Sequence, residues 1–277
     1  MRLIIEPIVR AALLEDLGRA GDITTEAVVP EEAEVGAVIA ARQPGVVAGL
    51  EAALLAFELS EPTLQIERLC DDGARISRGE LVARIEGRAR GVLAAERTAL
   101  NLLSRMSGVA TATRAFADAI AGSKAKIVCT RKTTPGLRTL EKEAVRLGGG
   151  ANHRFGLDDA MLIKDNHIAL AGGVRPALER ARRNAGHLVK IELEVDTLEQ
   201  LPEALAIGVD AVLLDNMTPE TMRRAVALVG GRAITEASGR INLETAPAVA
   251  ATGVDLISSG WITHSAPILD LGLDIES

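Results

Sequence analysis

Basic side chains gather in one stretch of a chain that is acidic overall. Residues 130–167 contain the pairs Arg131–Lys132 and His153–Arg154 together with Lys164, whereas the whole chain has a net charge of −7. Arginine offers a planar fork that matches a carboxylate or a phosphate, and lysine offers a compact point charge. This mixture suits a small substrate with several anionic groups. The alternative is a solvated basic loop.

Two acidic residues and two glycine turns extend this set. Glu194 and Asp215 each end an apolar run, and carboxylates without a Cys or His cluster suit Mg²⁺ held mainly through water and substrate phosphates. Ser238–Gly239 and Ser259–Gly260 end two later runs, where backbone N–H groups can bind phosphate. The sequence therefore predicts a pocket with basic residues on one side, two carboxylates beside them and a phosphate site last.

The elements that position these residues form a regular series. Apolar runs begin near residues 188, 210, 232 and 254, so successive starts are 22 residues apart, and helical patterns such as 174–186 and 218–230 lie between runs. This spacing is close to the shortest practical βα unit. About 150 residues at this period supply six or seven units, fewer than the eight of a full barrel. We therefore predict an incomplete α/β barrel with polar residues at the carboxyl ends of its strands.

Strand alternation refines the expectation for residues 188–195. Lys190, Glu192 and Glu194 share one face, which is expected to point into the barrel because the opposite face is apolar. A buried carboxylate needs a partner, and Lys190 is the expected partner of Glu192.

The first half of the chain predicts a scaffold. Residues 8–17 and 50–59 have helical patterns, and 92–121 predicts a long helix that Gly108 can kink or break. Arg97 lies off the apolar face of that helix, so it is either free to reach a ligand or a partner chain, or an ordinary surface arginine paired with a neighbour. The strand–turn–strand pattern of 71–89 resembles a biotinyl or lipoyl carrier but contains no lysine.

Composition excludes several classes of function. Aromatic residues make up 1% of the chain and the net charge is negative, which argues against a nucleic-acid-binding surface. Cys70 and Cys129 lie in no metal-binding spacing and are expected to be small buried residues in a reducing compartment. No apolar stretch approaches membrane-spanning length. We expect a cytoplasmic protein.

Several motifs together resemble one family. The segments ERTALNLLSRMSGVAT, TRKTTPGLRTLEKEAVRLGGGANHR, LIKDNH, LLDNM, EASG and THSAPILDLGLDI, with EDLGRAGDITT near the start, are similar to quinolinate phosphoribosyltransferase, the carboxylating nicotinate-nucleotide pyrophosphorylase. The resemblance implies an N-terminal α+β sandwich domain over residues 1–107. It also implies an open, seven-stranded α/β barrel over residues 108–277, with a C-terminal tail that can pack on the first domain.

The resemblance also implies an activity and a site. The enzyme would be a pentosyltransferase of NAD biosynthesis that transfers phosphoribosyl from phosphoribosyl pyrophosphate to quinolinate with decarboxylation. It would require Mg²⁺ and act as a homodimer, or a higher oligomer, with shared active sites. The implied site residues are the following. Arg131, His153 and Arg154 would hold quinolinate, together with Arg97 of the partner subunit, and Lys132 and Lys164 would neutralise anionic groups of the substrates. Glu194 and Asp215 would hold the ribose hydroxyls and Mg²⁺. The 5-phosphate would be bound by Ser238, Gly239, Ser259 and Gly260.

Two departures and three alternatives remain. Arg240 stands where the family often has a second glycine, and Trp261 follows the last phosphate loop where a small residue is common. Lys164 could instead form a Schiff base, as in an aldolase-type barrel enzyme. The chain could also be a molybdenum-operon homologue with a changed substrate, or a non-catalytic binding protein.

Overall fold

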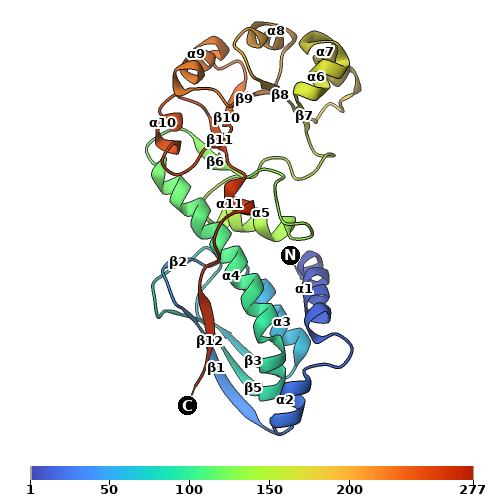
Figure 1. Ribbon diagram of the computed structural model, residues 1–277, viewed down its shortest axis with the longest axis vertical. Coiled ribbons are helices and arrows are strands. Elements are labelled where there is room, and N and C mark those ends of the chain that lie inside the picture. Colours follow the sequence, from blue (N-terminus) through green and yellow to red (C-terminus); the bar gives the residue numbers. More distant parts are fainter. Residues whose placement is uncertain (1, 277) are drawn as a thin grey trace. The chain divides into compact units, whose positions relative to one another are not determined.

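The chain folds into two compact units, which are described separately. The computed structural model describes residues 2–276. Unit 1 comprises residues 2–114, Thr134–Gly149 and 266–276, and unit 2 comprises Ala115–Thr133 and Gly150–Ser265. Figure 1 shows both units along the chain.

Unit 1 contains a four-stranded antiparallel sheet in the order β12-β1-β5-β3. Strand β1 (Glu34–Ala41) pairs with β5 (Leu81–Arg88) on one side and with β12 (Leu271–Ile275) on the other, and β3 (Gln65–Arg68) pairs with β5. One edge strand of this sheet therefore comes from a segment that follows unit 2 in the chain. The other elements are α1 (Arg2–Leu17), α2 (Ile23–Val28), β2 (Gly45–Val46), α3 (Leu50–Ser60), β4 (Arg75–Ile76), α4 (Ala89–Ala119) and α5 (Arg138–Leu147).

Apolar spacing explains the helices of unit 1. Helix α1 buries Ile5, Val9 and Leu13, an i, i+4 series on one face. The helix starts earlier than residue 8, and it includes Pro7 at the cost of one backbone hydrogen bond. Helix α4 runs through Gly108 without a break, so the expected kink is absent. The glycine serves packing instead, because a Cβ there would lie 2.1 Å from the Pro267 carbonyl oxygen.

A buried carboxylate anchors helix α5 within unit 1. Glu141 has no exposed surface, and its Oε1 accepts from Arg105 Nη2 at 2.9 Å. The same side chain accepts hydrogen bonds from the Thr134 hydroxyl at 2.7 Å and the Thr134 N–H at 3.0 Å. A buried charge is tolerated only when it is paired and hydrogen-bonded, and Glu141 meets both conditions.

Unit 2 is a six-stranded parallel sheet in the order β6-β11-β10-β9-β8-β7. Figure 1 shows α7, α8, α9 and α10 in an arc on the outer side of these strands. The helices expected near 174–186 and 218–230 are present as α7 and α9. The elements are β6 (Lys126–Val128), β7 (Met161–Ile163), α6 (Asp165–Ala171), α7 (Val174–Asn184), β8 (Ile191–Val195), α8 (Gln200–Ile207), β9 (Ala211–Asp215), α9 (Pro219–Val229), β10 (Ile234–Ser238), α10 (Ala246–Ala250), β11 (Leu256–Ser258) and α11 (Trp261–His264).

The sheet of unit 2 is open between its edge strands β6 and β7. Next to β6, Ala151 forms one isolated parallel bridge with Val128. The Ala151 N–H donates to the Ile127 carbonyl at 2.8 Å, and the Cys129 N–H donates to the Ala151 carbonyl at 3.2 Å. The described residues thus form an open α/β barrel with six strands and a single bridge where the resemblance implies a seventh strand. No further strand pairing directly follows Ala151 in the described chain, and His153, two residues later, lies at the carboxyl ends of the strands.

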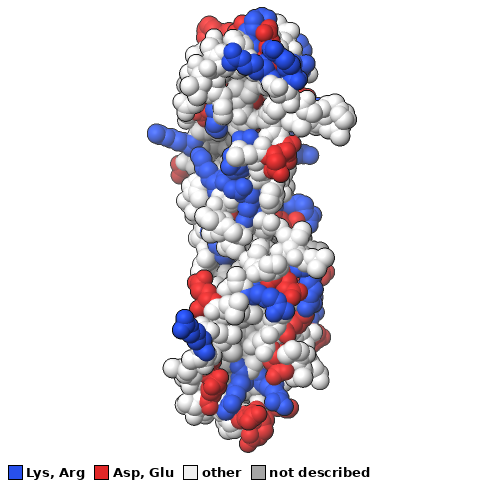
Figure 2. All heavy atoms as spheres, turned by 90° about the vertical axis from the view of Figure 1, so that its right-hand side faces the viewer, with Lys and Arg blue, Asp and Glu red and all other residues white. Residues whose placement is uncertain are grey.

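Two further observations concern the molecule's surface and its helices. Within residues 2–276, no helix combines the length and apolar character needed to cross a membrane. On the face drawn in Figure 2, Lys and Arg side chains are interspersed with Asp and Glu.

Candidate active site

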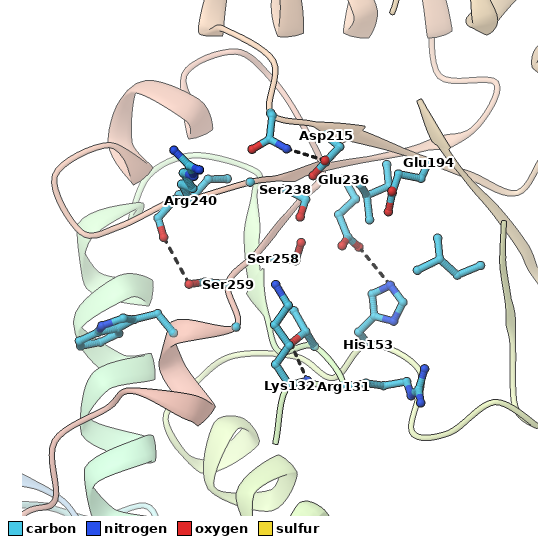
Figure 3. A pocket seen from close by; sticks show the side chains of 18 of the residues that line it. Arg131, Lys132, His153, Glu194, Asp215, Glu236, Ser238, Arg240, Ser258 and Ser259 are labelled. Carbon is cyan, nitrogen blue, oxygen red and sulfur yellow. Dashed lines mark hydrogen bonds and ion pairs between the residues drawn. The ribbon is translucent and has the colours of Figure 1, made fainter. Parts of the chain in front are cut away.

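A cavity of about 780 Å³ lies in unit 2, lined by residues that end or follow its strands. Figure 3 shows Arg131 and Lys132 at the bottom of the cavity, Asp215, Glu236 and Glu194 across the cavity from them, and Arg240 and Ser259 on the left. Eleven of the twelve predicted site residues line this cavity: Arg131, Lys132, His153, Arg154, Lys164, Glu194, Asp215, Ser238, Gly239, Ser259 and Gly260. The twelfth, Arg97, is exposed on α4 and does not line it.

Arg131, Lys132 and Arg154 form the basic side of the cavity. The Lys132 carbonyl accepts a hydrogen bond from the buried Thr263 hydroxyl at 2.8 Å, which ties the loop after β6 to α11. Burial lowers the pKa of the Arg154 guanidinium, and the like charge of Arg131 lowers it further. Neighbouring like charges are relieved by an anion, so this side is suited to carboxylates.

Both ring nitrogens of His153 are engaged by the protein. Nδ1 accepts the Arg154 backbone N–H at 2.7 Å, so Nε2 carries the proton and donates it to Glu192 Oε2 at 2.9 Å. A substrate carboxylate at Nε2 would therefore compete with Glu192. His153, Glu192 and Glu236 place ligand-type atoms within 4.8 Å of one another. A metal at Nε2 would require an unprotonated nitrogen there, so the hydrogen bonds favour a shared proton over a metal.

Glu236 is the most deeply buried carboxylate at the floor of the cavity. Glu236 is 1% exposed, and its Oε1 has no hydrogen-bond partner among residues 2–276. Burial raises the pKa of Glu236 to about 7, and the charge of Glu192 contributes, whereas His153 and Ser258 act in the opposite direction. Glu236 therefore holds a proton below about pH 7.

The carboxylates nearer the rim are paired with polar neighbours. Glu194 Oε2 lies 2.5 Å from Lys164 Nζ, and Asp215 Oδ2 accepts from Asn216 Nδ2 at 2.5 Å. They lie on adjacent strands, because β8 pairs with β9. Both carboxylates border the cavity, so an anionic substrate with a metal ion can reach them.

The prediction for β8 is confirmed for its faces and wrong for one partner. Apolar residues of β8 are buried, while Glu192 and Glu194 are half-buried and turn to the cavity side. Lys190 lies outside β8, before its first residue, and pairs with Asp210 at 2.6 Å. Glu192 pairs instead with His153, a residue 39 positions away.

Two glycine loops form a further part of the cavity wall. Gly239 has φ +100°, and a Cβ there would lie 2.4 Å from Asn216 Oδ1, so only glycine fits. A Cβ at Gly260 would lie 2.8 Å from Lys132 Cδ, which places the Lys132 stem against this loop. The N–H groups of Gly239 and Gly260 donate to no acceptor among residues 2–276. Such N–H groups can bind phosphate oxygens.

Several cavity residues were not in the predicted site. Asn216, Glu236 and His264 border the cavity. Asn216 and His264 directly follow strand-end motifs, so their positions in the βα series were the available signal. The Glu192–His153 contact has no local signal, because it joins distant segments.

Comparison with known proteins identifies the family. The models for the N-terminal and C-terminal domains of quinolinate phosphoribosyl transferase match residues 22–107 and 109–274. The chain belongs to the quinolinate phosphoribosyltransferase family. It is therefore an enzyme of the pentosyltransferase class, from a family of NAD biosynthesis.

Quinolinate phosphoribosyltransferases from distant organisms match almost the whole chain. "Nicotinate-nucleotide pyrophosphorylase [carboxylating]" of Mycobacterium leprae (strain TN) is 48% identical over 272 residues, covering 96% of this chain and 95% of the relative. The chloroplastic protein of that name from Arabidopsis thaliana is 40% identical over 291 residues, covering 99% of this chain and 83% of the relative. The crystal structure of NadC from Streptococcus pyogenes has a TM-score of 0.95 at 39% identity, covering 100% of this chain and 99% of that one.

Proposed function

We propose that this chain transfers the phosphoribosyl group of phosphoribosyl pyrophosphate to quinolinate. The products would be nicotinate mononucleotide, pyrophosphate and CO₂. One observation carries the proposal: a single cavity is lined by two arginines, two glycine loops with N–H groups that are free within residues 2–276, and two carboxylates. Quinolinate carries two carboxylates on adjacent ring carbons, and phosphoribosyl pyrophosphate carries a phosphate on C5 and a pyrophosphate on C1. Separate anion-binding groups in one cavity can therefore hold both substrates side by side.

The basic side would hold quinolinate. Arg131 and Arg154 would bind its two carboxylates, with His153 orienting the ring. The depressed pKa of Arg154 beside Arg131 supports this role, since an anion between the guanidiniums relieves their repulsion. Gly239 and Gly260 would bind the 5-phosphate through their N–H groups, which donate to no acceptor among residues 2–276, and Ser238 and Ser259 through their hydroxyls.

The reaction would proceed by positioning and electrostatics, without a nucleophilic side chain. The pyridine nitrogen forms a bond to ribose C1 while the C1–oxygen bond breaks, and those electrons leave with pyrophosphate. Lys132 and Lys164 would stabilise the departing charge, and Glu194 and Asp215 the cationic ribosyl group. The pyridinium ring then accepts the electrons of the C2–carboxylate bond as CO₂ departs, and C2 takes up a proton.

Mg²⁺ fits the donor set of Glu194 and Asp215. Both offer hard oxygen atoms that border the cavity, but two carboxylates form no complete cage. Such a site suits Mg²⁺, which keeps several waters and takes substrate phosphate oxygens. When bound, the ion would neutralise pyrophosphate charge. Glu194 also pairs with Lys164, so the lysine would turn to the substrate as the ion binds.

A homodimer with shared sites would account for Arg97. This residue is exposed on α4 and forms no hydrogen bond or ion pair with the described residues, so it is available to a second copy. Arg97→Ala and Lys164→Ala should each abolish activity alone and recover it in mixed dimers, because one site then keeps both residues. Absence of recovery on mixing would refute a shared site. We also propose that the protein is cytoplasmic.

An endpoint assay tests the reaction directly. Quinolinate, phosphoribosyl pyrophosphate and Mg²⁺ are supplied together and singly omitted, while nicotinate mononucleotide and CO₂ are measured. Product that requires all three supports the proposal. Product from nicotinate or another aromatic acid alone would indicate a relative with a changed substrate. Trapping of a carbonyl substrate on Lys164 by borohydride would indicate the aldolase alternative, although the Glu194 ion pair engages the amine that a Schiff base needs.

A further inference from the structure

Arg240 has an unusual backbone conformation for a residue with a side chain. Its φ is +50°, and it shares a positive φ with only Asn216 among the described non-glycine residues. Left-handed backbone disfavours a residue with a Cβ, and asparagine adopts it more readily than arginine. Glycine would carry no such cost at this position. Arginine at such a position indicates that its side chain has a use.

The position of Arg240 suggests what that use is. The residue directly follows Gly239 at the end of β10, and it borders the cavity together with Ser238 and Ser259. Figure 3 shows Arg240 on the side of Ser259, away from His153 and Arg131. Its guanidinium therefore belongs to the phosphate end of the cavity, not to the end that would hold the pyridine carboxylates.

Nothing within the described residues accounts for the Arg240 side chain. It is exposed, and it forms no hydrogen bond or ion pair with residues 2–276. Its backbone N–H also donates to no acceptor there. Within the described residues, Arg240 thus combines a free amide and an unpaired guanidinium at the edge of the cavity, and a guanidinium fork matches phosphate oxygens in pairs.

Charge balance gives a second argument. A phosphate monoester carries a charge of roughly −1.5 to −2 at pH 7. Lys132 and Lys164 are assigned to the departing pyrophosphate. Arg240 therefore supplies a positive charge beside the glycine loops that the pyrophosphate does not share.

We propose that Arg240 binds the 5-phosphate of the phosphoribosyl substrate and strengthens its binding beyond what a glycine at this position allows. The inference rests on the proposed function, because that function supplies the phosphorylated ribose. It concerns this chain's own departure from the family pattern, and it makes Arg240 a determinant of affinity for the ribosyl substrate.

Equilibrium binding of two probes tests the proposal. Ribose 5-phosphate and inorganic pyrophosphate are titrated separately into the full chain by calorimetry, with the fluorescence of Trp261, the single tryptophan and a cavity residue, as a second signal. The variants are Arg240→Gly, Arg240→Lys and the matched charge-removal control Arg224→Ala, on an exposed position of α9. Arg240→Gly is informative because it removes the guanidinium and relieves the left-handed backbone, so the fold is not expected to lose stability.

The expected result is selective. Arg240→Gly should raise the dissociation constant for ribose 5-phosphate about tenfold, as expected for loss of a charged hydrogen bond, while the pyrophosphate constant and the melting temperature do not worsen. Arg240→Lys should lie between the two, and Arg224→Ala should bind like the wild type. Unchanged ribose 5-phosphate binding in Arg240→Gly, or weakening of pyrophosphate alone, would overturn this inference and leave the proposed function standing. A wild type that does not bind ribose 5-phosphate would overturn both.

Discussion

Glu236→Gln is expected to remove much of the pH dependence of the stability of unit 2. Glutamine has nearly the same shape as glutamate and stays neutral, so the change removes one ionisation from the barrel interior. The native carboxyl is almost fully buried, and one of its oxygens has no hydrogen-bond partner within the part of the chain that the structure describes. Its ionised form is therefore poorly solvated in the folded state.

The magnitude follows from the pKa of Glu236 in the two states. It rises from 4.5 to about 7 on folding. Below pH 4.5 both states hold the proton, so the group has no pH-dependent effect. Between pH 4.5 and 7 only the folded state holds it, so each pH unit lowers the free energy of unfolding by about 1.36 kcal/mol. Above pH 7 the loss is complete and amounts to about 3 kcal/mol.

Urea unfolding at several pH values measures this effect. The fluorescence of Trp261, the only tryptophan of the chain and a residue of unit 2, follows the transition. Other titrating groups largely cancel when the variant is compared with the wild type at each pH. The stability advantage of Glu236→Gln should grow by about 2.5 kcal/mol between pH 5 and pH 8, because part of the total change lies below pH 5. Glu220→Gln, an exposed position on α9, is the control and should show no such trend.

Two outcomes would refute this reasoning. A constant difference between variant and wild type from pH 5 to pH 8 would mean that Glu236 does not change its protonation in that range. A variant that loses stability as the pH rises would mean that the charged carboxylate is stabilised, for example by a cation bound beside His153 and Glu192.

Three further predictions concern other contacts. Glu141→Ala should lower the free energy of unfolding of unit 1 by about 3–5 kcal/mol, measured with urea, because it leaves Arg105 without its buried partner. The control Glu143→Ala breaks a neighbouring surface ion pair and should lower it by less than about 1 kcal/mol. Equal losses in the two variants would contradict the argument. Thr263→Val should lower kcat with little change in melting temperature, because it removes the hydrogen bond that holds the loop carrying Lys132. Thr263→Ser keeps the hydroxyl and should restore kcat. A normal kcat in Thr263→Val would exclude this positioning role. Arg154→Ala should raise KM for quinolinate about ten- to hundredfold, and an effect confined to KM for phosphoribosyl pyrophosphate would disprove the assignment of the basic side.

The sequence predicted the barrel and its rim because both depend on local periodicity. The 22-residue spacing predicts a series of consecutive βα units. Parallel strands in such a series have their carboxyl ends at the same edge of the sheet. Residues as distant as Lys164 and Ser259 could therefore be placed in one cavity. The faces of β8 followed from alternation in the same way.

The remaining features depend on contacts between distant segments, which local patterns do not encode. Lys190 was assigned to Glu192 because they share a strand face, but the strand begins one residue later and Asp210 is available to Lys190. The Gly108 break was expected from propensity alone, and the approach of Pro267 explains the glycine instead. The positive φ of Arg240 is set by the conformation of its loop, and the neighbouring residues of the sequence did not predict it.

Strand β12 has a consequence for how the protein is made on the ribosome. Its residues 271–275 pair with β1, yet they are synthesised after every residue of unit 2. At about 5–20 residues per second, translation from β5 to β12 takes on the order of ten seconds. During that time β1 presents an unpaired edge, which is prone to pairing with other nascent chains. We therefore expect unit 2 to be able to fold before unit 1 is complete. A stop codon just before Leu271 should destabilise unit 1 more than unit 2, although most of unit 1 is far from the deletion in sequence.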